Sequence, residues 1–190
     1  MANDKYLIRE KYKYIRNQMS PKDVTLCSTV IFKNIMNHDA YKLASCVFVY
    51  MSMFHEVDTY DFIVESLALG KTIAIPRIEN KTMDFYKIED IEDVKQGYFG
   101  ILEPVSNHIL TPRDNDLMII PGLAFDIQGY RVGYGGGYYD TYISTHQGIQ
   151  YVKAGVAYEV QVTSEVPRKS YDQPIDLLFT EALDYKFTKL

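Results

Sequence analysis

The segment from Arg131 to Asp140, with the sequence RVGYGGGYYD, constrains the fold and function of this chain most strongly. It has four glycines within five residues, and glycine permits backbone conformations and close approaches that side chains forbid. Successive N–H groups in such a loop can converge on an anion. Tyr138 onward is predicted to be helical, which would place the loop at a helix N-terminus, where the helix dipole also favours phosphate. The segment therefore predicts a phosphate-binding loop.

Two common glycine-rich nucleotide motifs do not fit this chain. A Rossmann fingerprint needs GxGxxG directly after a strand, whereas this loop begins well after the preceding strand candidate. A Walker A loop needs GxxxxGK[ST], but the Gly-Lys-Thr that starts at Gly70 has Glu65 in place of the first glycine. Gly70 is better explained as a helix C-cap. A simple tight turn remains an alternative for the glycine loop, although two glycines usually suffice for one.

Charged residues stand at both ends of the loop. Arg131 can bind a phosphate through two hydrogen bonds, and Asp140 can hold Mg²⁺ beside phosphate oxygens. Asp176 would supply a second carboxylate if it lies near the loop. The alternatives are that Arg131 and Asp140 pair with each other or with solvent, and that Asp176 is an ordinary surface aspartate.

A second candidate site follows the first predicted strand, Ser45 to Met51. The segment from Phe54 to Thr59 comes directly after it, and α/β sheets bind ligands in the loops at the carboxyl ends of parallel strands. Glu56 can accept hydrogen bonds from ring N–H donors of a substrate, and Met51 can lie against an aromatic ring. A solvated carboxylate at a helix start and a core methionine remain the alternatives.

Strand and helix patterns alternate along the chain. Ser45 to Met51 and Thr72 to Ile75 are strand candidates on either side of a helix that Asp58 and Thr59 can cap, which predicts a βαβ unit. Further strand candidates are Met83 to Ile88, Leu117 to Ile120, Tyr151 to Val156 and Leu177 to Phe179. With 190 residues, we expect a single domain over residues 1–190, an α/β layered fold whose largely parallel sheet is flanked by helices.

The first predicted helix, Lys5 to Met19, is amphipathic. Apolar residues recur at helical spacing, and a parallel basic stripe consists of Lys5, Arg9, Lys13 and Arg16. Without further information such a stripe is most simply a solvated face. Ser20 and Pro21 then predict the N-cap and first residue of a second helix, which should run to about Asn37.

Composition excludes several classes of protein. A net charge of -5 argues against a general nucleic-acid binder. The amino terminus lacks the apolar core of a signal peptide, and no stretch approaches the ~18 apolar residues of a membrane span. Cys27 and Cys46 lack CxxC spacing and predict reduced thiols. We expect a cytoplasmic monomer that has small-molecule substrates and neither nucleic-acid nor membrane partners.

Taken together, these segments resemble the 5-formyltetrahydrofolate cyclo-ligase family, also called methenyltetrahydrofolate synthetases. The resemblance covers nearly the whole chain, and its most specific block is PGLAFDIQGYRVGYGGGYYD. The other blocks fall in the expected order: Lys5-x-x-x-Arg9, Glu56-Val57-Asp58-Thr59, Gly70-Lys71 with Ile75-Pro76-Arg77, and Phe99-Gly100-Ile101-x-Glu103-Pro104.

The resemblance implies a reaction and a set of site residues. The reaction is the ATP- and Mg²⁺-dependent cyclisation of 5-formyltetrahydrofolate to 5,10-methenyltetrahydrofolate, with ADP and phosphate released, through a phosphorylated formyl intermediate. The implied ATP contacts are Lys5, Arg9, Arg131, Val132, Gly133, Tyr134, Gly135, Gly136, Gly137, Tyr138 and Tyr139. The implied folate contacts are Met51, Glu56, Tyr134, Gly135, Gly136, Gly137 and Tyr138. The implied magnesium-associated carboxylates are Asp140 and Asp176.

The chain departs from the family pattern at three positions. Some relatives carry basic residues inside the glycine loop, where this chain has Tyr134 and Gly136. In the family, Tyr-Tyr-Asp is often followed by Arg, whereas this chain has Thr141 at that position. More of the charge that neutralises phosphate must then come from Arg131, the first helix and the metal. Two other functions remain open: a non-catalytic protein that binds a phosphorylated metabolite or a folate, and an isomerase of phosphorylated sugars.

Overall fold

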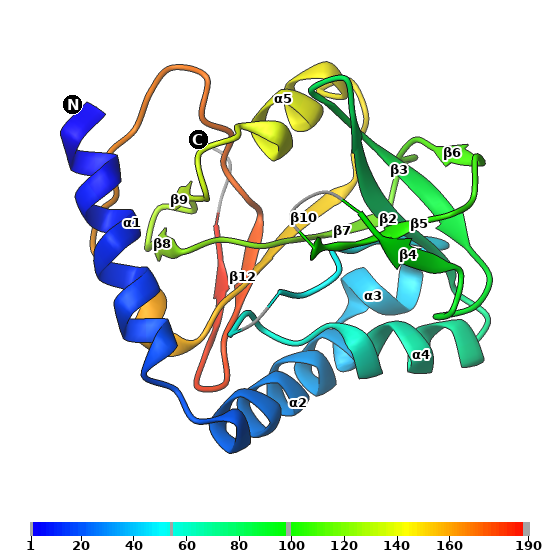
Figure 1. Ribbon diagram of the computed structural model, residues 1–190, viewed down its shortest axis with the longest axis horizontal. Coiled ribbons are helices and arrows are strands. Elements are labelled where there is room, and N and C mark those ends of the chain that lie inside the picture. The colour runs from blue at the N-terminus through cyan, green and yellow to red at the C-terminus, as the bar shows by residue number, and fades with distance from the viewer. Residues whose placement is uncertain (1, 54, 98–99, 188–190) are drawn as a thin grey trace.

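The structure is a computed structural model that describes residues 2–53, 55–97 and 100–187 (Figure 1). Phe54 and Phe99, which belong to two of the motifs above, lie outside these residues. The described helices are α1 (Ala2–Asn17), α2 (Pro21–Asn37), α3 (Asp39–Leu43), α4 (Tyr60–Ala68), α5 (Tyr138–Thr145) and the 3₁₀ helix η2 (Glu159–Gln161). None of them is long and apolar enough to cross a membrane.

A sheet of eight strands, counted within the described residues, runs in the order β13-β12-β10-β7-β1-β2-β3-β6. From β12 to β2 neighbouring strands are parallel, whereas β13, β3 and β6 pair antiparallel. Its strands are β1 (Cys46–Phe48), β2 (Thr72–Glu79), β3 (Thr82–Ile88), β6 (Ile109–Leu110), β7 (Leu117–Ile120), β10 (Val152–Val156), β12 (Leu177–Phe179) and β13 (Asp184–Lys186). The expected α/β fold with a largely parallel sheet flanked by helices is confirmed.

Helices cover both faces of this sheet (Figure 1). Neighbouring residues of a strand point to opposite faces, so Val47 packs in the core cluster under α2, α3 and α4, while Phe48 packs in the cluster under α5. Ile31 and Ile35 bury one stripe of α2 against the first cluster, which contributes about 2 kcal/mol for each side chain. Burial on both faces explains why the central strands are almost continuously apolar.

Several local expectations are confirmed. The Ser20 side chain accepts a hydrogen bond from the Asp23 N–H at 3.2 Å, and α2 ends at Asn37. The predicted βαβ unit is formed by β1, α4 and β2. Gly70, with a φ of 78°, lies one residue beyond the C-cap of α4, a left-handed position that suits glycine.

A smaller sheet beside the main one positions the glycine loop. It has the strand order β11-β8-β9, from β8 (Ala124–Asp126), β9 (Arg131–Val132) and β11 (Val162–Thr163). A third pair joins β4 (Val94–Gln96) to β5 (Leu102–Pro104). α1 lies along β8 and β9 (Figure 1), and its buried Tyr12 packs with Leu123 and Val132. This contact fixes α1 next to the strand that leads into the loop.

Candidate active site

The glycine loop, Gly133 to Gly137, connects β9 with α5, so its expected place at a helix N-terminus is confirmed (Figure 1). Gly135, with a φ of 110°, and Gly137, with a φ of 70°, adopt left-handed conformations that favour glycine, and Gly137 is the N-cap of α5. Gly136 is constrained by packing, because an added Cβ would lie 2.5 Å from the ring of Tyr138.

Gly133 differs from the other three glycines. Its φ is not in the left-handed region, and a Cβ built on it would meet no described atom within 4 Å. Neither backbone conformation nor packing therefore requires glycine here. A ligand that approaches the backbone closely would require it, and the exposure of Tyr134 to Gly137 leaves the loop accessible to one.

Arg131 is buried just before the glycine loop and contacts both α5, which follows the loop, and the segment before β12. Its guanidinium donates to the Gln173 carbonyl at 3.0 Å and pairs with Asp140 at 3.2 Å. The Gln173 N–H donates to the same Asp140 oxygen at 3.0 Å. Arg131 and Asp140 thus pair with each other, which is one of the alternatives that the sequence left open for them. A phosphate contact of Arg131 stays a prediction, and such a phosphate would share the guanidinium with Asp140.

The basic stripe of α1 is largely turned inward, so it is not a solvated face. Lys5 and Arg16 are buried, and Lys5 pairs with Asp172. Arg9 is half-buried, and its Nε donates to the Gly133 carbonyl at 2.8 Å. The first helix therefore contacts the glycine loop directly and brings cations to its edge.

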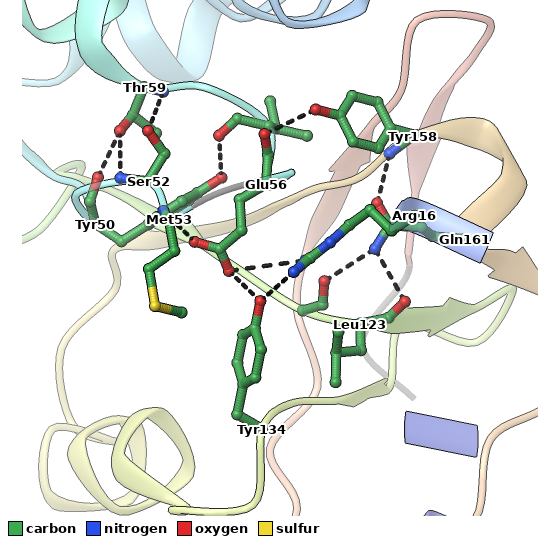
Figure 2. Close-up of polar contacts among 12 residues, drawn as sticks. Arg16, Tyr50, Ser52, Met53, Glu56, Thr59, Leu123, Tyr134, Tyr158 and Gln161 are labelled. Atoms are coloured by element: carbon green, nitrogen blue, oxygen red, sulfur yellow. Dashed lines mark hydrogen bonds and ion pairs between the residues drawn. The ribbon is translucent and has the colours of Figure 1, made fainter. Parts of the chain in front are cut away.

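Glu56 lies at the centre of a buried polar cluster (Figure 2). Only 4% of it is exposed, which excludes a solvated carboxylate. Its Oε2 accepts a hydrogen bond from the Met53 N–H at 2.8 Å, and its Oε1 accepts one from the Tyr134 hydroxyl at 2.7 Å. Arg16 approaches the same Oε1 to 3.8 Å and donates to the Tyr134 hydroxyl. The glycine loop and the predicted folate carboxylate are therefore in direct contact.

Opposing effects act on the charge of this cluster. Burial raises the pKa of Glu56, while the hydrogen bonds from Met53 and Tyr134 and the charge of Arg16 lower it. Burial and the charge of Glu56 also raise the pKa of Tyr134, so the phenol remains protonated and donates to the carboxylate. Although 41% of Tyr134 is exposed, its hydroxyl points into the cluster (Figure 2).

A pocket of about 330 Å³ opens beside Glu56 and is lined by Met53 and the first residues of α2. Met51 does not line it; this residue is buried and packs in the core cluster under α2, α3 and α4. The structure thus favours the alternative that Met51 is a core residue, and its folate contact stays a prediction. Met53, which no sequence pattern singled out, is the methionine against the pocket.

A larger groove, of about 620 Å³, lies between α2 and α4 and shares Thr25 and Asp58 with this pocket. Its described lining has three carboxylates, Asp58, Asp61 and Glu65, and one lysine, Lys33. Such a balance of charge repels a polyanion. The groove is therefore a poor site for ATP, in spite of its size.

The two predicted magnesium carboxylates belong to different ion pairs. Asp140 pairs with Arg131, whereas Asp176 pairs with the Lys153 Nζ at 2.8 Å and accepts from the Lys153 N–H at 2.9 Å. Within the described ranges, no group of three or more His, Cys, Asp or Glu side chains could hold a metal. Mg²⁺ often needs only one or two carboxylates beside substrate phosphates. Asp140, in the first turn of α5, fits that kind of site, and the role of Asp176 stays a prediction.

Two further residues hold the backbone of the site. The Tyr158 hydroxyl donates to the Glu56 carbonyl at 2.7 Å, and the Gln161 side chain donates to the Gly122 and Leu123 carbonyls at 3.0 and 2.9 Å (Figure 2). Both come from the segment around η2, far from their partners in sequence. No pattern in the sequence points to either residue. Arg16, in contrast, belongs to the basic stripe that the sequence shows in the first helix.

Asp126 supports the hairpin that leads into the glycine loop. It is fully buried and accepts from the N–H groups of Gln128, Tyr130 and Val166, and it pairs with Arg168 at 2.9 Å. We expect Asp126→Ala to lower the free energy of unfolding by about 3 kcal/mol, because it leaves these donors without an acceptor. Urea unfolding followed by circular dichroism measures the change.

The matched control for this prediction is Asp114→Ala. Asp114 is exposed and accepts from the Gln150 N–H at 2.8 Å, so its loss should cost at most about 1 kcal/mol. Equal losses in the two variants would show that Asp126 does not anchor the hairpin.

Comparisons with known proteins agree with the sequence motifs. The model of the 5-formyltetrahydrofolate cyclo-ligase family matches residues 1–181. The chain is 26% identical to 5-formyltetrahydrofolate cyclo-ligase of Mus musculus over 186 residues, which cover 92% of each protein. It is 33% identical to the probable 5-formyltetrahydrofolate cyclo-ligase of Schizosaccharomyces pombe over 169 residues, 80% of this chain and 83% of that protein.

Structural similarity extends over almost the whole chain. The NMR structure of Aquifex aeolicus 5,10-methenyltetrahydrofolate synthetase matches it with a TM-score of 0.86 and 31% identity, over 98% of this chain and 94% of that one. The resemblance drawn from the motifs is therefore confirmed. The chain belongs to the 5-formyltetrahydrofolate cyclo-ligase family.

Proposed function

We propose that this protein uses ATP and Mg²⁺ to cyclise 5-formyltetrahydrofolate to 5,10-methenyltetrahydrofolate. Family membership indicates the cyclo-ligase activity, and the proposal adds the nucleotide, the metal and the residues. The observation that carries it is the hydrogen bond between Tyr134 and Glu56, which joins the predicted phosphate loop to the predicted folate carboxylate. Transfer of a phosphoryl group between two substrates requires that they be held close together and oriented.

In this proposal the phosphates of ATP lie along the loop from Arg131 to Tyr139. The open space at Gly133 and the N-terminus of α5 support this placement. Lys5 and Arg9 supply positive charge after they exchange some of their present protein contacts for phosphate oxygens. Arg131 adds its charge while Asp140 and Gln173 still hold its guanidinium in place. Asp140 would hold Mg²⁺ together with those oxygens, and the metal would neutralise charge on the phosphates.

The folate would enter the pocket beside α2. Glu56 accepts hydrogen bonds from ring N–H donors of the folate, because an ionised carboxylate offers acceptors and no donor. Met53 lies in the same lining and offers a polarisable contact for the ring. Tyr134 to Tyr138 would touch both substrates.

The chemistry then proceeds in two steps. The formyl oxygen on N5 attacks the γ-phosphorus of ATP, ADP leaves, and the formyl carbon becomes part of a phosphorylated imine-like group. N10 attacks that carbon and loses its proton, and inorganic phosphate leaves to give the methenyl product. These steps depend on positioning and charge neutralisation more than on a protein nucleophile.

One assay tests the proposal against its rivals. The protein is incubated with 5-formyltetrahydrofolate, Mg²⁺ and ATP, and methenyl absorbance is followed together with ADP. We expect equal amounts of both products, neither of them without ATP, and loss of both when a chelator removes the metal. A non-catalytic binding protein would bind ligand without turnover, and a sugar-phosphate isomerase would act without ATP. The absence of ATP-dependent methenyl product would contradict the proposal.

A further inference from the structure

We propose that Arg16 is a positioning residue for the folate half of the reaction: it holds the Glu56 carboxylate and the Tyr134 hydroxyl in the arrangement that receives the pteridine ring. The inference rests on the proposed function, because it takes a folate as the ligand of Glu56. Neither the family motifs nor the implied contacts assign a role to Arg16.

The geometry places Arg16 at the junction of three chain segments (Figure 2). It extends from α1 into a buried position, with 6% of its side chain exposed. One guanidinium nitrogen lies 3.8 Å from Glu56 Oε1, and the other donates to the Tyr134 hydroxyl. The guanidinium carbon also lies 5.6 Å from the centre of the Tyr134 ring. Arg16 therefore orients the hydroxyl so that its proton points to Glu56.

The charge of Arg16 matters because Glu56 is buried. A carboxylate removed from water tends to take up a proton, and a protonated carboxyl group has a donor where an ionised one has an acceptor. The charge of Arg16 opposes this and lowers the pKa of Glu56. Together with the hydrogen bonds from Met53 and Tyr134, Arg16 thus favours the ionised form of Glu56, which accepts hydrogen bonds from ring N–H groups.

The positive charge of this cluster comes from α1 and not from the loop. Between Val132 and Asp140 the glycine loop contains no cation of its own. Arg16 brings a guanidinium from α1 to Tyr134, the one residue between Gly133 and Gly137 that is not glycine.

If Arg16 only held α1 against the loop, its loss would have a different effect from loss of a positioning residue. Loss of a structural contact would weaken the binding of folate and of ATP together, at every pH. Loss of the positioning charge would act on folate, and more strongly at low pH. The sign follows from the pKa: without Arg16 the already raised pKa of Glu56 rises further, so the carboxylate is protonated over a wider range and recovers only as pH increases. Tyr50 and Tyr139 also face Glu56, but burial raises the pKa of both phenols, so they stay uncharged over this range.

The decisive variant is Arg16→Gln. Binding of 5-formyltetrahydrofolate is measured by calorimetry between about pH 6 and pH 9. ATP is left out, so that no turnover occurs during the measurement. We expect affinity about tenfold weaker than that of the original protein at neutral pH, with recovery toward pH 9, while ATP affinity changes by less than about threefold. A constant loss of affinity across the pH range, or an equal loss for ATP, would overturn the proposal.

Two variants separate charge from geometry. Arg16→Lys keeps a cation near Glu56 and should restore the pH profile of the original protein. Lys13→Gln removes another cation of the same stripe, one that pairs with Glu10 on the surface of α1, and should leave folate affinity unchanged. A pH-dependent loss in Lys13→Gln would mean that the total charge of α1, and not Arg16, sets the effect.

If Arg16→Gln does not fold, the double variant Arg16→Gln/Glu56→Gln removes both buried charges at once. Its folate affinity should equal that of Glu56→Gln alone, because Arg16 acts through Glu56. A further loss of several-fold would contradict that route. The binding measurement also separates the two proposals: if the original protein binds folate without forming methenyl product, the proposed reaction fails while the role of Arg16 is still tested.

Discussion

Arg131→Ala is expected to lower kcat/KM for ATP about 100- to 1,000-fold, because it removes a buried cation next to the proposed phosphate site. Charge that develops during phosphoryl transfer is stabilised most by fixed groups that are shielded from water. Arg131 is such a group, since its partners Asp140 and Gln173 already hold its guanidinium in place. Steady-state kinetics with varied ATP at saturating folate measure the effect.

The same substitution should also reduce stability, because Arg131 has structural contacts. Loss of the pair with the partly exposed Asp140 and of the Gln173 hydrogen bond should cost about 2 kcal/mol. Arg131→Lys is therefore the matched variant: lysine can still pair with Asp140, but it cannot bind a phosphate through two parallel bonds. We expect it to recover most of the stability and little of the ATP efficiency. If both variants lose stability while their kcat/KM for ATP stays unchanged, Arg131 is structural.

Glu56→Gln should raise the KM for 5-formyltetrahydrofolate about 10- to 100-fold and leave the KM for ATP nearly unchanged, because a hydrogen bond to a charged acceptor is stronger than one to an amide. Glutamine fills the same volume and can still accept from the Met53 N–H. Its amide nitrogen is a donor, however, and would face ring N–H groups with no acceptor. The measurement is the KM for each substrate, with the melting temperature as a check on folding.

Asp58→Asn is the control for this change. Asp58 lies two residues further along, but its carboxylate accepts from the Ser52 hydroxyl and from the Tyr60 N–H at the start of α4. Asparagine is also a good N-terminal capping residue, so folding should be retained. Because Asp58 also lines the proposed folate pocket, we expect a normal KM for ATP and a folate KM that rises by less than about threefold. A folate KM that is unchanged in Glu56→Gln, or raised equally in Asp58→Asn, would count against the role of Glu56.

Local patterns accounted for the elements that depend on local chemistry. Ser20 caps α2 because its side chain reaches an N–H three residues ahead, and this relation is visible in sequence. Gly137 begins α5 because it needs a left-handed conformation. The βαβ unit followed from apolar runs separated by helix signals. The pairing of β3 and β6 was less predictable, since strand direction depends on partners distant in sequence.

The sequence by itself determined the layered α/β fold, the glycine loop at a helix start and the family. Tertiary structure alone decided how the site is connected: Arg16 turns inward to Glu56, Arg131 pairs with Asp140, and Met53 faces the pocket while Met51 is in the core. The reason is physical. Glycine conformation and helix capping act over a few residues, whereas burial of a charge and the face a side chain takes depend on packing between segments far apart in sequence.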